Sequence, residues 1–355
     1  MSFIHSPDIA FDEIKLRMKN EEGLMKFGVD FLDEATEGIL SNDLILVGAR
    51  SGAGKTQFCC NVAWSNVQSG RKVHYIALEA EYAEIERRIK YGIFSELYFS
   101  RHKGNEHQVS FKNWMLGRLS VTLANLEAEA AEIFKTKSQG LHTYYKQEAF
   151  DVKRFIETVM SCARDTDLII VDHVHYFDFD DANENRAIKE IAMAARDLAI
   201  HQGKPMILVG HIRKSDRNST DKVPGMEEFH GSSDLFKIAT KAITIAPGDN
   251  YTRDGKAETF MRIVKDRFDG SLQRHMASLV YDIRKGTYEQ NYKLGPEKQK
   301  RSEEFREYSP SDIPRWVRSL RTVRGDHDRI PQGAAGRSAP LPNHARFTRG
   351  FHEKD

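Results

Sequence analysis

Short apolar runs alternate with amphipathic helical patterns along most of the chain, from about residue 27 to residue 292. The clearest runs predict strands at residues 43–48, 72–78, 167–172, 205–210 and 241–246. These runs are continuously apolar, which is typical of parallel strands that helices cover on both faces. The pattern therefore predicts an α/β fold with a mostly parallel central sheet.

Weaker patterns extend this core. Further strands are expected at 141–147, 259–266 and 277–282, and Gly270 suggests a hairpin turn between the last two. A helix is expected between residues 183 and 201, because apolar residues recur there on one stripe: Ile188, Ile191, Ala192, Ala195, Leu198 and Ala199.

The two ends of the chain differ from this core. Residues 8–20 predict a short amphipathic helix, so residues 1–26 are interpreted as a linker segment and residues 27–293 as the core domain. Residues 294–355 hold six of the ten prolines and no sustained periodicity, which predicts a flexible, irregular tail.

Composition excludes several classes of protein. Forty per cent of the residues are hydrophobic, enough for a buried core, and no apolar run is long enough for a membrane span. The 53 basic and 52 acidic residues nearly balance, so any nucleic-acid surface must be local. The start of the chain lacks the pattern of a secretion signal, and Cys59, Cys60 and Cys162 have no metal-ligand spacing. A soluble, cytoplasmic protein is expected.

Residues 49–56, ARSGAGKT, directly follow a predicted strand and open a predicted helix. They form a phosphate-binding P-loop pattern with Ala49 where glycine is usual. Glycines let backbone N–H groups close around phosphate oxygens, and the helix presents its positive end to them. The residues expected to bind ATP are Ser51, Gly52, Ala53, Gly54, Lys55, Thr56 and Gln57. Lys55 would reach the β- and γ-phosphates, and the Thr56 hydroxyl would ligate Mg²⁺.

Two acidic residues end neighbouring strands. Asp172 follows four apolar residues and is expected to hold Mg²⁺, directly or through water; the alternative is an ordinary strand-terminal aspartate. Glu79 follows the strand 72–78 and is a candidate general base for the attacking water. The alternative for Glu79 is the first member of an acid-rich helix start.

The stretch FGVDFLDEATEGILSNDLILVGARSGAGKT at 27–56 resembles the entry to the RecA-like motor domain of DnaB-type replicative helicases, Ala49 included. Further similarities follow in order at Leu78-Glu79, 171–177 and 229–246. The segment GHIRK at 210–214 is closer to the Twinkle and phage primase–helicase branch, and VKDRFDG at 264–270 resembles the motif that reaches a neighbouring subunit's ATP.

The resemblance implies an ATP- and Mg²⁺-dependent ring, most simply a hexamer, that translocates on single-stranded DNA in replication or in maintenance of a mobile element. It makes Glu79 the catalytic glutamate, His211 a γ-phosphate contact, and Lys265 with Arg267 cations delivered in trans. Lys265 and Arg267 occupy alternate strand positions and should project to one face. Without the resemblance, both would pass for exposed edge-strand cations, and His211 for a histidine satisfied at a strand end.

A basic loop occupies the position of the family's central-channel loop. Its candidate contacts to DNA phosphates are Arg213, Lys214, Arg217 and Lys222. A solvated charged loop is the alternative, and the other channel segment, 178–185, is acidic. Only about 26 residues precede the motor, so a primase or loader would be a separate partner. Two other functions stay open: a RecA-like ATPase that coats or remodels DNA without unwinding, and a nucleotide-switched scaffold that contacts only proteins.

Overall fold

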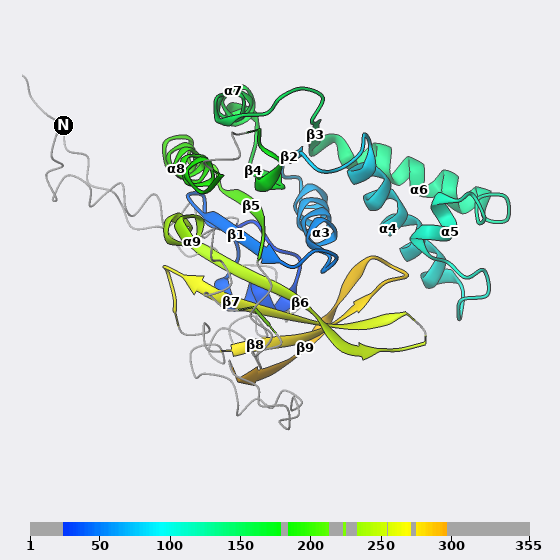
Figure 1. The fold of residues 1–355 in the computed structure, drawn as a ribbon. Helices are drawn as coiled ribbons and strands as arrows, with labels where there is room; N and C mark the ends of the chain where they lie inside the picture. The colour runs from blue at the N-terminus through cyan, green and yellow to red at the C-terminus, as the bar shows by residue number, and fades with distance from the viewer. Residues whose placement is uncertain are drawn as a thin grey trace, which may run out of the picture. The chain divides into compact units, whose positions relative to one another are not determined.

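The computed structural model describes residues 24–178, 184–212, 223–224, 233–253, 255–270 and 275–296 (Figure 1). The predicted linker helix at 8–20 and nearly all of the predicted tail from 294 lie outside these residues. The division into a linker, a core from 27 to 293 and a tail therefore stays a prediction.

A single sheet of nine strands organises the described residues, in the order β3-β2-β4-β5-β1-β6-β7-β8-β9. Six of these strands run parallel, which confirms the expected fold class. They are β1 (Leu44–Ala49), β2 (Val73–Ala77), β3 (Leu141–Tyr145), β4 (Leu168–Asp172), β5 (Met206–His211) and β6 (Lys241–Tyr251). Strands β1 and β4 are buried along their whole length, as their continuous apolar runs predicted.

The remaining three strands are antiparallel and extend the sheet beyond β6. They are β7 (Lys256–Asp266), β8 (His275–Asp282) and β9 (Thr287–Pro296). Sequence patterning located β7 and β8 but missed β9. Strand β9 alternates polar and apolar residues and is mostly solvent-accessible, with Tyr288 as a buried exception, so it lacks a continuous apolar run.

Helices cover both faces of the parallel strands. α3 (Lys55–Gln68) contacts β1, β2 and β4 on one face. α7 (Val152–Cys162) and α8 (Glu184–Gln202) pack in one apolar cluster with Leu44, Leu46 and Ile169 on the other. Figure 1 shows α3 and α8 on opposite sides of the strands, and α8 lies where the apolar stripe predicted a helix.

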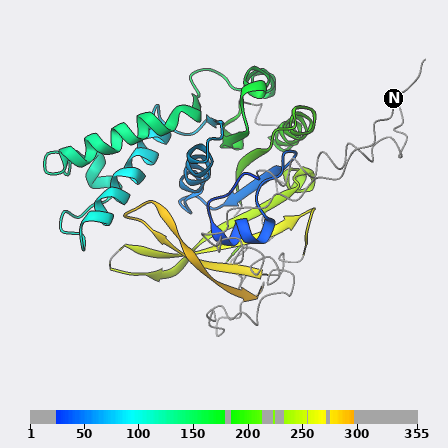
Figure 2. The ribbon, with the colours of Figure 1, turned by 180° about the vertical axis from the view of Figure 1, so that it is seen from behind.

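The other helices are short or come between β2 and β3 in the sequence. α4, α5 and α6 form one helical group, best seen apart from the strands in Figure 2. Their bounds, with those of the two short helices, are α2 (Asp30–Thr36), α4 (Glu84–Arg101), α5 (Phe111–Met115), α6 (Ala124–Lys137) and α9 (Ser233–Ile238). Among the described residues, no helix combines the length and apolar character needed to cross a membrane.

Candidate nucleotide site at the ends of the parallel strands

The P-loop connects the buried end of β1 to the first turn of α3. Gly52 and Gly54 have φ angles of 76° and 88°, a left-handed conformation that favours glycine. A Cβ atom at either position would meet nothing within 4 Å, so the loop borders open space. The first N–H groups of α3 have no intrahelical acceptor and lie at the positive end of the helix. This geometry suits an anionic phosphate.

Lys55 is buried at the start of α3, with only 7% of its surface exposed. Its Nζ contacts the carbonyl oxygens of Ala49 and Arg50 at 3.1 and 3.2 Å and Nδ1 of His211 at 3.2 Å. Burial lowers the pKa of Lys55, while the charges of Asp172 and Glu79 act to raise it. The lysine thus sits in the P-loop with acceptors that phosphate oxygens can replace.

Asp172 ends β4 beside β2 and is 2% exposed. Tyr75 donates a hydrogen bond to its Oδ2 at 2.8 Å, whereas its buried Oδ1 has no hydrogen-bond partner among the described residues. Burial raises the pKa of Asp172, and the hydroxyls of Tyr75 and Thr56 act in the opposite direction. A carboxylate with one unsatisfied oxygen and a contact to the Thr56 hydroxyl fits Mg²⁺, a cation that prefers oxygen ligands.

The described part of the chain holds no group of three or more His, Cys, Asp or Glu side chains arranged to bind a metal ion by themselves. Mg²⁺ in nucleotide sites does not need such a group, because it is usually held by one or two protein oxygens together with phosphates and water. The pair Thr56 and Asp172 is consistent with that mode.

Glu79 lies two residues beyond β2 and is exposed. Its charge acts on Lys55, Asp172 and His211, so the structure brings these four predicted residues to one edge of the sheet. The hydroxyl of Tyr176 hydrogen-bonds to Glu79. Desolvation raises the pKa of Tyr176 most, and the charge of Glu79 and this hydrogen bond raise it further. An exposed carboxylate held by one hydroxyl can orient a water molecule.

Histidines line this edge beyond the one that sequence reasoning selected. His211 lies opposite Ala49 in the β1–β5 register, and its ring centroid is 4.1 Å from that of His173 and 5.6 Å from that of His175. Nε2 of His173 and Nδ1 of His175 are buried without a hydrogen bond to the described residues. The signal available in the sequence was the DHVH spacing directly after β4.

His173 and His175, the two histidines that the sequence did not single out, are neutral in the folded chain. Burial, with the charges of His211 and Lys55 in support, lowers the pKa of His175 from 6.5 to about 4. Burial and the other two histidines lower the pKa of His173 to about 2. Neutral rings beside Lys55 avoid placing further cations against it.

We expect the contribution of His173 and His175 to the free energy of unfolding to fall as pH drops from 6.5 towards 4. In that window the unfolded chain takes up protons on His173 and His175 while the folded chain does not, so each contributes a slope of about 1.4 kcal/mol per pH unit. Denaturant titrations between pH 7.5 and 4.5 would measure this slope. His175→Gln should reduce it by about 1.4 kcal/mol per unit; an unchanged slope would mean that His175 is protonated in the folded protein.

Lys265 and Arg267 lie at the opposite edge of the sheet from the P-loop. Lys265 is opposite Ala242 in the antiparallel register, and Ala242 is opposite Leu46 near the start of β1. Lys265 Nζ and Arg267 both donate to the carbonyl oxygen of Lys237 at the end of α9, at 2.9 and 2.7 Å. The expected common direction is therefore seen, although β7 ends at Asp266 and Arg267 lies one residue beyond it.

Other predicted residues have different surroundings. The Gln57 side chain donates to the carbonyl of Gly286 at 3.0 Å, so it faces the β8–β9 turn, while its backbone belongs to the first turn of α3. Ser51 and Gly52 are exposed at the tip of the P-loop. The predicted DNA contacts lie outside the described residues: Arg213, Lys214, Arg217 and Lys222.

Comparison with known proteins places the chain in a family. Residues 24–285, about three quarters of the chain, match the model of the DnaB-like helicase C terminal domain. The chain belongs to this family. The replicative DNA helicase DnaB of Geobacillus stearothermophilus is 23% identical over 268 residues, which cover 72% of this chain and 54% of that protein. The chain spans about half the length of the curated relatives it matches first.

Solved structures agree on the fold of this family member. One of them, an ATPase domain, superposes with a TM-score of 0.65 at 17% identity, covering 81% of this chain and 99% of that domain. Another is a DnaB-like replicative helicase, described with its interactions with primase. It superposes with a TM-score of 0.63 at 17% identity, and the match covers 81% of this chain and 67% of the helicase chain. The RecA-like ATPase fold is therefore confirmed for the described core.

Proposed function

We propose that this chain is an ATP-hydrolysing motor that assembles into a ring, most simply a hexamer, and translocates on single-stranded DNA as a helicase. One observation carries the proposal. In this chain, a member of the DnaB-like family, the P-loop and the acidic residues lie at one edge of the sheet, and Lys265 and Arg267 lie at the other. Lys265 lies level with Leu46, three residues before the end of β1 at Ala49, or roughly 10 Å, and Arg267 lies further from the P-loop, so we infer that these cations serve the nucleotide of another copy.

Within one copy, each residue has a separate task in hydrolysis. The P-loop N–H groups and Lys55 bind the β- and γ-phosphates, and Thr56 and Asp172 hold Mg²⁺, which when bound neutralises phosphate charge. Glu79 orients a water molecule and accepts its proton as the water oxygen bonds to the γ-phosphorus. The bond between the γ-phosphorus and the bridging oxygen breaks, releasing ADP and phosphate. Lys265 and Arg267 of a neighbour stabilise the charge on the transferring group.

His211 is the proposed connection between this chemistry and DNA. Its Nδ1 contacts Lys55 Nζ at 3.2 Å, and the chain enters the basic loop two residues later. When γ-phosphate attracts Lys55, His211 exchanges one partner for another and can transmit that change to the loop. The basic residues Arg213, Lys214, Arg217 and Lys222 would then grip backbone phosphates without reading sequence.

We expect single-stranded DNA to stimulate steady-state ATP hydrolysis, and Arg217→Ala/Lys222→Ala to abolish the stimulation while basal hydrolysis persists. The reason is that phosphate contacts dominate non-specific binding and are strongest at low salt. Lys135→Ala/Lys137→Ala, a matched charge change on α6, should leave stimulation intact. A strand-displacement assay then separates unwinding from coating of DNA. Absence of stimulation at low salt would reject the DNA motor in favour of a protein-directed switch.

A further inference from the structure

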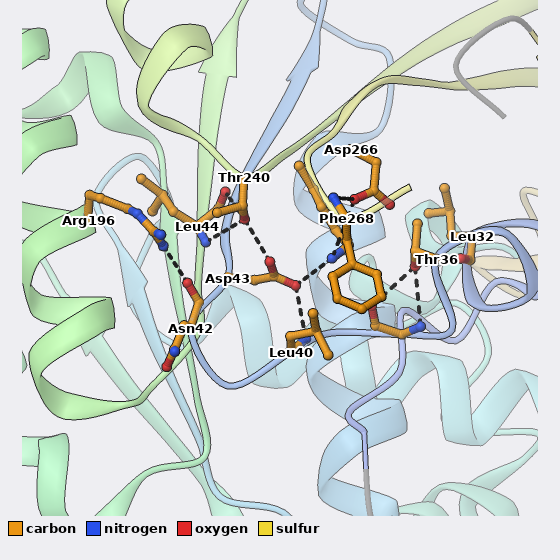
Figure 3. A network of polar contacts seen from close by, with 12 residues as sticks. Leu32, Thr36, Leu40, Asn42, Asp43, Leu44, Arg196, Thr240, Asp266 and Phe268 are labelled. Atoms are coloured by element: carbon orange, nitrogen blue, oxygen red, sulfur yellow. Dashed lines mark hydrogen bonds and ion pairs between the residues drawn. The ribbon is translucent and has the colours of Figure 1, made fainter. Parts of the chain in front are cut away.

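A cluster of three charged side chains is buried at the edge of the sheet that carries Lys265 and Arg267. Asp43 precedes β1, Lys241 begins β6 and Asp266 ends β7; their side chains are 5%, 2% and 3% exposed. Lys241 Nζ lies 2.7 Å from Asp43 Oδ2 and 3.9 Å from Asp266 Oδ1. Figure 3 shows Asp43 and Asp266 in one network of polar contacts at this edge.

The first half of the network joins β1 to β6. Asp43 Oδ2 also accepts a hydrogen bond from the Leu40 N–H at 2.9 Å, and its Oδ1 accepts one from the Thr240 hydroxyl at 2.7 Å. The same hydroxyl oxygen accepts a hydrogen bond from the Leu44 N–H at 3.0 Å (Figure 3). Thr240 is therefore fixed against the strand that leads into the P-loop.

The second half of the network holds the backbone around Arg267. The Arg267 N–H donates to the Thr240 carbonyl at 3.0 Å, and the Phe268 N–H donates to Asp266 Oδ1 at 2.9 Å. Burial raises the pKa of Asp266, whereas Lys241 and the N–H groups of Phe268 and Asp269 act to lower it. Arg267 itself is exposed, but its own N–H is bonded to the backbone of Thr240 and the next N–H, of Phe268, to the buried carboxylate of Asp266.

Stability alone is a weak reason for this arrangement. Buried ion pairs lose hydration, and apolar residues of similar volume often stabilise a protein as well or better. What the cluster supplies instead is a fixed backbone position at the end of β7, where the strand would otherwise fray.

We propose that the cluster of Asp43, Lys241 and Asp266, acting through Thr240, positions Arg267 and Lys265 for the ATP of a neighbouring copy. This inference rests on the proposed function. Catalytic groups must be held closely, since a displacement of about 1 Å can lower a rate on the order of 10²-fold. The cluster members are positioning residues because none of them reaches the phosphate.

Asp266→Asn is the sharpest test. The amide keeps a similar shape and an acceptor for Phe268 N–H, but it removes the charge that faces Lys241. We expect kcat for ATP to fall about 10- to 100-fold, while KM for ATP stays within about twofold because the variant's own P-loop is untouched. Thr240→Ala removes the hydroxyl link to Asp43 but keeps all three charges, and it should also lower kcat.

Mixed assemblies distinguish positioning from general damage. Lys55→Met copies cannot hydrolyse ATP at their own P-loops but carry intact Arg267. Adding them to Asp266→Asn copies should raise the hydrolysis rate per Asp266→Asn copy several-fold. As a stability control, Asp151→Ala removes the side chain that caps α7 by accepting from Arg154 N–H, and it should leave kcat unchanged.

The outcomes separate this inference from the proposed function. Full kcat in Asp266→Asn and Thr240→Ala, with a defective Arg267→Ala, would overturn the positioning role and leave the trans-acting role in place. A fall in kcat that Lys55→Met copies do not rescue would overturn it as well. Full activity of Arg267→Ala would instead reject the trans-acting role itself.

Discussion

Arg267→Ala is expected to lower ATP hydrolysis on the order of 10³-fold or more while leaving ATP binding intact. The guanidinium donates to the Lys237 carbonyl at the edge opposite the P-loop, so its removal disturbs no contact with the nucleotide of its own chain. Under the proposed function, the substitution removes a cation that would neutralise transition-state charge on a neighbour's nucleotide. Steady-state hydrolysis and equilibrium binding of a fluorescent ATP analogue, measured on the same preparation, would separate the two effects.

Mixing experiments make the same prediction sharper. Copies with Arg267→Ala keep a competent P-loop, and copies with Lys55→Met keep a competent Arg267, so a mixture should hydrolyse ATP faster than the sum of its parts. Arg253→Ala, an exposed arginine in the β6–β7 connection, provides the matched control and should retain the wild-type rate. A mixture that hydrolyses ATP no faster than the sum of its parts, or an Arg267→Ala protein at full rate, would contradict action in trans.

The parallel half of the fold was predictable from the sequence because strands that are buried on both faces have a simple sequence pattern. Strands such as β1 and β4 consist of continuous apolar residues, and the glycines of the P-loop mark a backbone that few other residues adopt. The antiparallel half has a weaker sequence pattern. β9 has mostly exposed or partly exposed side chains, so only its pairing with β8 defines it.

The site was predictable where a motif fixes both residue type and place. Lys55, Asp172 and Glu79 each follow a recognisable strand, and the structure brings them together. His173 and His175 carried no such mark, because a histidine pair after a strand has many uses. Their closeness to His211 depends on β4 and β5 being neighbours in the sheet.

The charged cluster lay beyond sequence reasoning for a different reason. Asp43 and Lys241 are 198 residues apart and each looks like a polar residue at the start of a strand. Only the parallel pairing of β1 with β6, and the antiparallel pairing of β6 with β7, brings them to Asp266. A contact of this kind is a property of strand order, which local periodicity does not record.

Lys55→Met should abolish ATP hydrolysis and yet leave the nucleotide-free protein as stable as the wild type, within about 1 kcal/mol. Burial lowers the pKa of Lys55, which shows that its charge is poorly hydrated in the folded chain. Methionine fills similar space without that penalty, although the carbonyls of Ala49 and Arg50 lose a donor. The fold therefore gains little from the charge, and under the proposed function ATP is the ligand that would make use of it.

Thermal unfolding with and without a non-hydrolysable ATP analogue measures this difference directly. A ligand at 100 times its Kd stabilises the folded state by about 2.7 kcal/mol, and Lys55→Met should lose most of that increment. Lys72→Met is the matched control, because Lys72 is half exposed and pairs with Asp165 before β2, away from the P-loop; it should keep both hydrolysis and the increment. A Lys55→Met protein that the analogue still stabilises fully would show that the backbone of the P-loop alone provides the binding energy, and that Lys55 acts only on the transition state.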